Sequence, residues 1–237
     1  IAETTAPIIA ITDDDCIVPT DWLAGVEIPF NDNPRVGVQF CSVKGVPVDR
    51  PGLTPEVILS ASRLVCRPST AWRLACGGLM LGAAMNIRRT MLADVVGFDE
   101  RLGPGSTFGA CEDNDLSWRG LYAGWWTYHN ADVTVMHDGF RDLDEVRALV
   151  IRDFYGVGGA IAKYLKAGKL QILVFMGAWL VRFGIVGPVR DVLSGRKPTG
   201  FRRPYMLMRG VIDGCRTSFE RTTLLYRPLD RPMDVTR

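Results

Sequence analysis

Apolar and polar positions along the first 140 residues fall into short blocks that predict strands and helices in alternation. Residues 7–12 are apolar and rich in β-branched side chains, which is typical of a buried strand. Three carboxylates, Asp13, Asp14 and Asp15, follow this strand directly. Ligands of open α/β sheets bind beyond the carboxyl ends of the strands, so these carboxylates lie where a functional site is expected.

The following blocks continue the alternation. Thr54, Pro55 and Glu56 have the cap-then-proline pattern of a helix start, and a helix is expected to run on through Leu64. The other expected elements are a short helix at 21–26, strands at 36–40, 125–129 and 133–137, a buried strand or loop of small residues at 75–87, and helices at 88–96 and from 112 to Gly124. This order of elements predicts an α/β domain over residues 1–140.

The pattern changes after His137. Apolar residues recur at helical spacing from 142 to 165, and a second apolar run occupies residues 170–180. This run is shorter than the roughly 20 residues that a membrane-spanning helix needs, so an interfacial helix or an ordinary helical subdomain is expected instead. Basic residues flank the run, namely Lys163, Lys166, Lys169, Arg182 and Arg190. Residues 141–237 are therefore expected to form a helical, basic extension.

Charge separates the two parts of the chain more clearly than its total of +2 suggests. Residues 1–140 carry 10 Lys/Arg against 17 Asp/Glu, a net charge of −7, and residues 141–237 carry 18 against 9, a net charge of +9. An acidic half suits a divalent cation, and a basic, partly apolar half suits an anionic membrane surface or a phosphorylated substrate. The basic residues form no recognised nucleic-acid-binding motif, so nucleic acid is not an expected partner.

Composition and cysteine usage narrow the class of protein further. With 47% apolar and 23% charged residues the chain is expected to be globular rather than disordered or integral to a membrane. Its six cysteines show no CxxC pair, which indicates free thiols in a reducing, cytoplasmic compartment. The chain begins with Ile1 and no signal peptide pattern, so it is expected to be a fragment or a processed piece.

The carboxylate triplet is the first candidate for chemistry. Like charges a few ångströms apart disfavour one another unless a cation compensates them. In an extended segment alternate residues point the same way, so Asp13 and Asp15 are expected to share Mg²⁺ or Mn²⁺. The alternative is a solvated acidic turn.

Two further features lie downstream. Glu112 and Asp113 open a predicted helix, where a carboxylate serves either as a general base or as a helix cap. His137 ends an apolar strand and is either a structural histidine or a neutral imidazole ligand of a metal.

The ordered set of these motifs resembles the family 2 glycosyltransferases of the GT-A fold. The resemblance covers about residues 8–140. It rests on the sequences Ile-Thr-Asp-Asp-Asp at 11–15 with Pro19 and Trp22-Leu23, Gly-Phe-Asp-Glu at 97–100, Glu-Asp-Asn-Asp-Leu at 112–116 with Arg119 and Gly124, and Val-Met-His at 135–137. It implies a GT-A-like mixed sheet flanked by helices, and transfer of a sugar from a nucleotide-sugar to a hydroxyl of a glycan or lipid-linked acceptor.

The resemblance also implies a role for each matching residue. Asp13 and Asp15 would be the outer carboxylates of the DxD motif and would hold Mg²⁺ or Mn²⁺ together with His137, while Asp14 would lie near the ribose or sugar of the donor. Asp113 would be the catalytic base of an inverting displacement, with Glu112 as the second choice. The remaining assignments are Gly77 and Gly78 to the donor, and Trp118 and Arg119 to the donor sugar or acceptor.

The chain departs from the family at its amino terminus. Family members place a nucleotide-binding half before the DxD motif, and only twelve residues precede Asp13 here. The alternative to an enzyme is therefore a truncated, non-catalytic, membrane-associated remnant of one. Basic helical extensions of related enzymes often lie on the cytoplasmic membrane, so a peripheral location there is expected. A phosphotransferase is disfavoured because the glycine loop GxxxxGK[ST] does not occur.

Overall fold

The computed structural model describes residues 3–55, 64–67, 82–195 and 201–228. The chain folds into two compact units, of which the first comprises residues 1–98 and 113–149 and the second comprises residues 99–112 and 150–237. The sequence analysis placed residues 99–112 in the first half of the chain, and the structure places this segment in the second unit.

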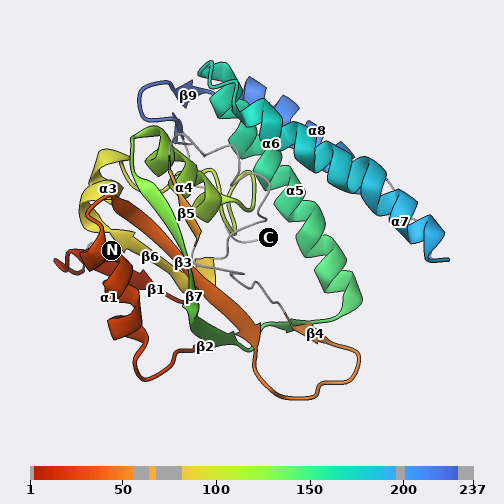
Figure 1. Cartoon of the computed structure of the whole chain (residues 1–237). Coiled ribbons are helices and arrows are strands. Elements are labelled where there is room, and N and C mark those ends of the chain that lie inside the picture. Colours follow the sequence, from red (N-terminus) through yellow and green to blue (C-terminus); the bar gives the residue numbers. More distant parts are fainter. Residues whose placement is uncertain (1–2, 56–63, 68–81, 196–200, 229–237) are drawn as a thin grey trace. The chain divides into compact units, whose positions relative to one another are not determined.

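In the described part of the first unit, six strands form one mixed sheet (Figure 1). The order along it is β1 (Ile8–Ile11), β6 (Met85–Arg88), β3 (Val36–Gly45), β7 (Trp126–His137) and β2 (Cys16–Ile17), and β5 (Leu64–Cys66) also pairs with β7. Strands β3 and β7 run parallel, and the other pairs are antiparallel. The acidic triplet connects β1 with β2 and therefore leads from one edge of the sheet to the other.

Helices cover both faces of this sheet. Helix α1 (Trp22–Asp32) buries Val26 and Phe30 against Val43 and Val135 on one face. Helices α3 (Arg89–Asp94) and α4 (Glu112–Tyr122) pack Met91 and Leu116 on the other face, against residues such as Val38, Phe40 and Ile87. Strand β3 is buried on both faces because it lies in the middle of the sheet. The expected α/β sheet flanked by helices is confirmed.

Long-range pairing overrides the local sequence pattern at two places. Thr54–Pro55 is the short strand β4, paired with β8 (Phe140–Arg141), and Leu64 lies in β5, so the helix expected from Thr54 to Leu64 is wrong at both ends. Pro55 fits there because an edge strand needs no N–H at that residue and because Gly45, against which it packs, has no side chain. Residues 56–63 lie outside the described part of the chain.

The two strands expected at 125–129 and 133–137 are one strand, β7. The sequence alternation is interrupted between them because the register with β3 shifts there: Asn130 lies opposite Cys41, and Thr134 lies opposite the next residue, Ser42. Such an irregularity adds residues to one strand without ending it. The strand therefore continues to His137 and to the edge where β2 pairs with it.

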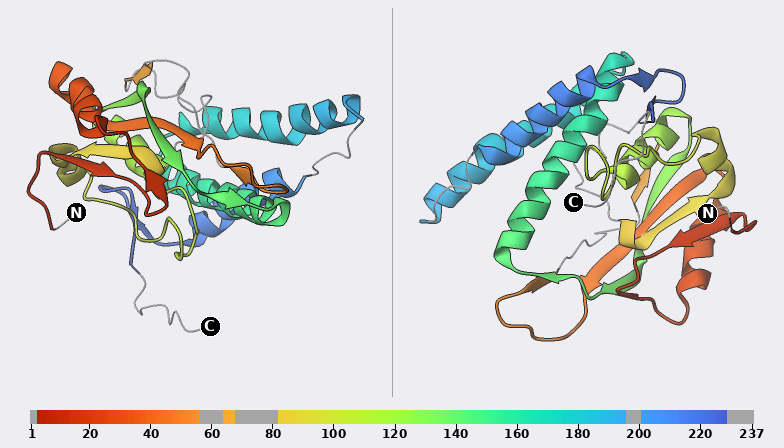
Figure 2. Two further views of the ribbon diagram at one scale, coloured as in Figure 1. Left: turned by 90° about the horizontal axis from the view of Figure 1, so that it is seen from below. Right: turned by 180° about the vertical axis from the view of Figure 1, so that it is seen from behind.

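The second unit is mainly helical. Its elements are the larger part of α5 (Leu143–Lys166), α6 (Ile172–Val181), a π-helical segment (Arg182–Val186), α7 (Gly187–Leu193), α8 (Arg202–Arg216) and the strand pair β9 (Phe219–Glu220) and β10 (Leu225–Tyr226). Helix α8 packs closely on α5 (Figure 2), where a Cβ atom at Gly158 would lie 2.1 Å from the carbonyl oxygen of Leu207.

A buried ion pair lies in this unit. The Nζ atom of Lys163 on α5 donates to Oδ2 of Asp99, and both side chains are fully buried. The same Asp99 oxygen accepts a hydrogen bond of 3.0 Å from the backbone N–H of Tyr226. A buried charge is tolerated only where it is paired and hydrogen-bonded in this way. The pair therefore anchors the segment that begins at Asp99 to the helical unit.

The helix that contains the apolar run at 170–180 extends well beyond that run. Helix α6 continues through the π-helical segment and α7, so that Ile172–Leu193 forms a 22-residue helix whose length and composition would allow it to cross a membrane. The expectation that this stretch is too short to span is wrong. The helix continues past Val181 because it contains a wide π-helical turn before Pro188, in which the N–H of Gly187 donates to the carbonyl of Arg182. This turn accommodates a proline that would otherwise break the helix.

Candidate metal centre and catalytic carboxylates

The acidic triplet forms a tight turn between two strands. The backbone N–H of Cys16 donates to the carbonyl of Asp13 over 3.2 Å, which closes a four-residue turn over the triplet. The next residues pair with the end of β7, and the N–H of Asp138 donates to the carbonyl of Asp15 over 2.9 Å. Asp13 and Asp15 therefore come together through a turn, and the extended conformation expected from the sequence is wrong.

This turn places the carboxylates beside His137. The Nε2 atom of His137 lies 3.1 Å from Oδ1 of Asp15, and His137 is only 3% exposed. Its other ring nitrogen, Nδ1, is buried and has no hydrogen-bond partner among the described residues. A buried imidazole with one unpartnered nitrogen beside two carboxylates is unusual, because buried polar atoms are nearly always satisfied.

Four side chains converge at this point. One potential ligand atom from each of Asp13, Asp15, Cys16 and His137 lies within 4.8 Å of all the others. Two carboxylate oxygens, an imidazole nitrogen and a sulfur are a donor set that binds divalent cations. The structure thus brings together the three residues expected to hold a metal and adds Cys16, which the sequence analysis did not single out although it follows the triplet directly. The carboxylates of Asp13 and Asp15 suit Mg²⁺ or Mn²⁺, with His137 as a nitrogen donor, and the role of these residues as ligands remains a prediction.

The environment of Cys16 differs from that of the other cysteines. Burial, together with the charges of Asp13 and Asp15, raises the pKa of its thiol. Burial alone raises the pKa of the Cys41 and Cys66 thiols to about 12, so these two are inert core residues. Cys16 is partly exposed and lies among charged groups.

Gly139 completes the surroundings of His137. A Cβ atom at Gly139 would lie 2.1 Å from Cε1 of the imidazole and 2.6 Å from Nδ1. No side chain fits there without moving the ring. Gly139 is thus a second residue that the sequence analysis missed, because its importance comes only from this close approach.

Glu112 and Asp113 have different surroundings at the start of α4. Asp113 is 8% exposed, and its Oδ1 atom accepts hydrogen bonds from the backbone N–H of Asn114 over 2.6 Å and from Nδ2 of Asn114 over 2.8 Å. Its Oδ2 atom faces Gly82, where a Cβ atom would lie 3.7 Å away. Glu112 instead packs over Gly103, where a Cβ atom would lie 3.1 Å from its carboxyl carbon.

The residue before this pair has an unusual backbone conformation. Cys111 has a φ angle of 83° although it is not a glycine. Such left-handed residues cost of order 1–3 kcal/mol and occur often at functional sites. This strain supports a functional role for the start of α4. Within the described residues, neither Glu112 nor Asp113 belongs to the four-residue cluster.

The other sequence-derived candidates have these positions. Asp14 is exposed in the turn and lies outside the cluster. Trp118 and Arg119 are buried on α4, and the Arg119 guanidinium binds Oδ2 of Asp115 over 2.8 Å and the carbonyl of Val95. Arg119 therefore ties α4 to the end of α3, and its contact with an acceptor remains a prediction. Gly77 and Gly78 lie outside the described residues.

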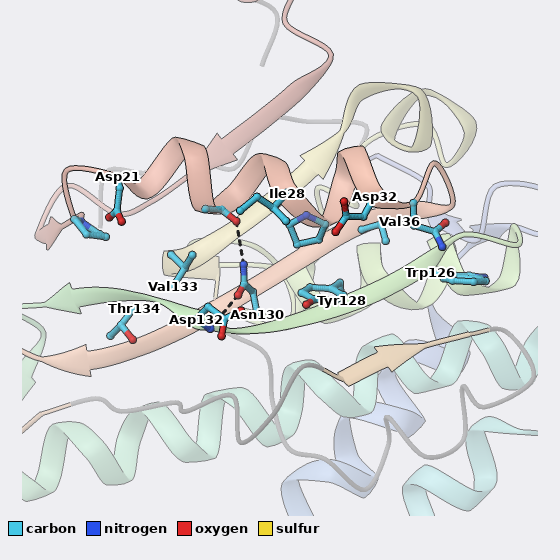
Figure 3. A pocket seen from close by; sticks show the side chains of 14 residues that line it. Asp21, Ile28, Asp32, Val36, Trp126, Tyr128, Asn130, Asp132, Val133 and Thr134 are labelled. Carbon is cyan, nitrogen blue, oxygen red and sulfur yellow. Dashed lines mark hydrogen bonds between the residues drawn. The ribbon is translucent and has the colours of Figure 1, made fainter.

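A cavity of about 690 Å³ lies between α1 and β7 (Figure 3). It combines carboxylates with aromatic rings and amides, and the side chains that give it this character are Asp21, Asp32, Trp126, Tyr128, Asn130 and Asp132. Asn130 shapes it, because its amide donates to the carbonyl of Gly25 on α1 over 3.2 Å and accepts from the N–H of Asp132 over 3.0 Å. The size is that of a small-molecule site.

Comparisons with known proteins complete the description. No protein-family model matches the sequence, and no curated protein matches it. Among solved structures, the chain is similar to the mannosyltransferase PcManGT from Pyrobaculum calidifontis, which was determined in complex with GDP-Man and Mn²⁺. The two are 15% identical with a TM-score of 0.47, and the match covers 93% of this chain and 54% of that enzyme. The chain thus spans about half the length of that mannosyltransferase.

Proposed function

We propose that this chain is a glycosyltransferase that uses Mg²⁺ or Mn²⁺ to move a sugar from a nucleotide-sugar to a hydroxyl group, with inversion at the anomeric carbon. The observation that carries this proposal is the convergence of Asp13, Asp15 and the buried His137 in one cluster. The same three residues are those that the family resemblance assigns to the metal. The Asp113 carboxylate at the start of α4 supplies the remaining group that the reaction needs.

Asp13, Asp15 and His137 would hold the cation at the turn between β1 and β2. When bound, the cation neutralises the diphosphate and stabilises it as the leaving group. Asp14 is exposed beside these residues and is available to the hydroxyl groups of the donor. A carboxylate accepts hydrogen bonds from such hydroxyls.

Asp113 is the proposed general base. Its Oδ1 atom is oriented by Asn114, and its Oδ2 atom faces a residue without a side chain, Gly82. In the reaction Oδ2 takes the proton of the acceptor hydroxyl while the acceptor oxygen bonds to the anomeric carbon and the bond to the diphosphate oxygen breaks. Attack opposite to the leaving group inverts the anomeric centre.

The matched variants Asp113→Asn and Glu112→Gln test this assignment. We expect Asp113→Asn to lower sugar transfer by about 10²–10⁴-fold, which is the usual contribution of a general base, and Glu112→Gln to lower it far less. The measurement is turnover of UDP-, GDP- and dTDP-sugars with a hydroxyl acceptor. Equal losses in both variants would contradict the assignment of Asp113. Nucleotide binding without turnover by the unaltered chain would instead support a non-catalytic remnant.

We also propose that the second unit binds an anionic membrane at the cytoplasmic side, where a lipid-linked acceptor is accessible. Only three residues of the helix Ile172–Leu193 are buried, and its exposed apolar residues include Val174, Val181, Ile185, Val189, Val192 and Leu193. Cationic side chains lie on the same helix and on α8, namely Arg182, Arg190, Arg202, Arg209 and Arg216. Apolar insertion combined with about 1 kcal/mol per basic residue near anionic lipid supports such binding.

A further inference from the structure

We propose that the sulfur of Cys16 is a fourth ligand at the Asp13, Asp15 and His137 cluster, and that it makes the site prefer thiophilic divalent cations such as Zn²⁺ and Cd²⁺ over Mg²⁺. This inference concerns the metal alone and goes beyond the proposed sugar transfer. It stands on strand register, on the distances within the cluster and on the burial of the histidine.

Strand register places the sulfur beside the imidazole. Cys16 lies directly opposite His137 in the antiparallel pairing of β2 with β7. Directly opposed residues of such a pair have their Cβ atoms about 4.5–5.5 Å apart and share one face of the sheet. The turn over residues 13–16 then brings the carboxylates to the same side. The four residues therefore form a single cluster from two strands and their connecting turn.

The distances suit one cation. In the tetrahedral geometry that Zn²⁺ prefers, ligand bonds of about 2.0–2.3 Å place the donor atoms about 3.3–3.8 Å from one another. One donor atom from each of the four residues lies within 4.8 Å of all the others, so inward shifts of about 1 Å at these side chains would complete the coordination. His137 supplies an independent sign of a ligand, because its imidazole is only 3% exposed, belongs to the cluster and places Nε2 at 3.1 Å from Oδ1 of Asp15.

The donor set determines the preferred cation. Mg²⁺ takes hard oxygen ligands in octahedral geometry, whereas thiolate and imidazole favour Zn²⁺ and related cations. Binding forms the metal–sulfur bond and releases the thiol proton to water. With Cys16 included, Zn²⁺ competes for the position that Mg²⁺ or Mn²⁺ would occupy during sugar transfer.

The experiment compares the full chain with Cys16→Ser, and uses Cys215→Ser as the matched control because Cys215 is an exposed free cysteine outside the cluster. Cd²⁺ is titrated while the ultraviolet charge-transfer absorption of a metal–thiolate bond is recorded, and the affinities for Zn²⁺ and Mg²⁺ are measured by calorimetry. We expect the absorption band in the unaltered chain and in Cys215→Ser but not in Cys16→Ser. We expect Zn²⁺ affinity to fall at least about tenfold in Cys16→Ser while Mg²⁺ affinity changes less than about twofold.

A second measurement needs no variant. Iodoacetamide labelling of the unaltered chain, followed by mass spectrometry of the Cys16 peptide, should show protection of Cys16 by Zn²⁺ or Cd²⁺ but not by Mg²⁺, while labelling of Cys215 stays constant. The inference would be overturned by a charge-transfer band that persists in Cys16→Ser, or by an extent of Cys16 labelling that is the same with and without Zn²⁺. Absence of sugar transfer by this chain would not contradict the inference that Cys16 is a ligand, because both measurements use the metal alone.

Discussion

The imidazole of His137 occupies space that a side chain at residue 139 would fill. Gly139 lies two residues further along the chain, and a methyl group there would overlap the ring at 2.1 Å. Real Cβ atoms do not approach other atoms so closely, so an added methyl must displace the ring. The geometry of the candidate metal centre therefore depends on Gly139 as much as on the ligands.

Gly139→Ala should consequently weaken metal binding without removing a ligand. We expect Mn²⁺ affinity to fall about 10–100-fold, as it does when the outer support of a metal ligand is lost. Gly177→Ala is the control, because Gly177 is a helical glycine whose Cβ position has no neighbouring atom within 4 Å from the rest of the described chain. Calorimetric titration of Mn²⁺ into both variants measures the effect, and equal affinities would show that the ring position does not matter.

Residue types and the family resemblance together predicted part of this site. Asp13 and Asp15 were expected to share a cation because both follow a strand, and the family resemblance implied that His137 joins them. Cys16 was missed because the direction of its side chain depends on the turn that begins at Asp13 and on pairing with β7. Gly139 was missed because a close approach between two residues leaves no sequence pattern.

Elements were predicted well where local pattern and tertiary contacts agree. The strand after Pro7, the helix that opens at Glu112 and the strand end at His137 follow their apolar periodicity. The pattern failed at Thr54–Pro55, where pairing with Phe140–Arg141 decides the structure. It also failed beyond Val181, because a π-helical turn lets a helix continue through a proline that normally ends one.

The long helix Ile172–Leu193 carries a prediction at the scale of one element. The double variant Ile185→Asp/Val189→Asp places two charges on its exposed apolar residues, which should lower membrane affinity at least about tenfold because charged groups resist insertion into lipid. Leu23→Asp/Ile28→Asp adds the same charge to exposed residues of α1 and serves as the control.

Co-sedimentation with vesicles measures this effect. We expect the unaltered chain and the control to bind phosphatidylcholine–phosphatidylglycerol vesicles more strongly than vesicles of phosphatidylcholine alone, because the basic side chains attract anionic lipid. Binding that is equal in both double variants, or that does not depend on anionic lipid, would contradict a membrane role for this helix.

The whole chain combines two units of different character. The metal cluster lies in a mixed sheet within the acidic part of the sequence, and the exposed apolar helix lies in the basic, helical part. The sequence analysis expected a boundary at residue 140 from the change in charge and pattern, and it did not indicate that residues 99–112 join the helical unit. That assignment depends on the buried contact between Asp99 and Lys163, whose partners are 64 residues apart.

The central claim is that the acidic turn holds a cation against a nucleoside diphosphate. Calorimetric titration of UDP, GDP and dTDP, each with Mn²⁺ or Mg²⁺, into the chain and into Asp13→Ala/Asp15→Ala tests it most directly. The account predicts metal-dependent binding of at least one nucleotide that the double variant loses by about 100-fold or more, since removal of metal ligands abolishes the site. Binding that is absent in the folded chain, or that survives unchanged in the double variant, would contradict the account.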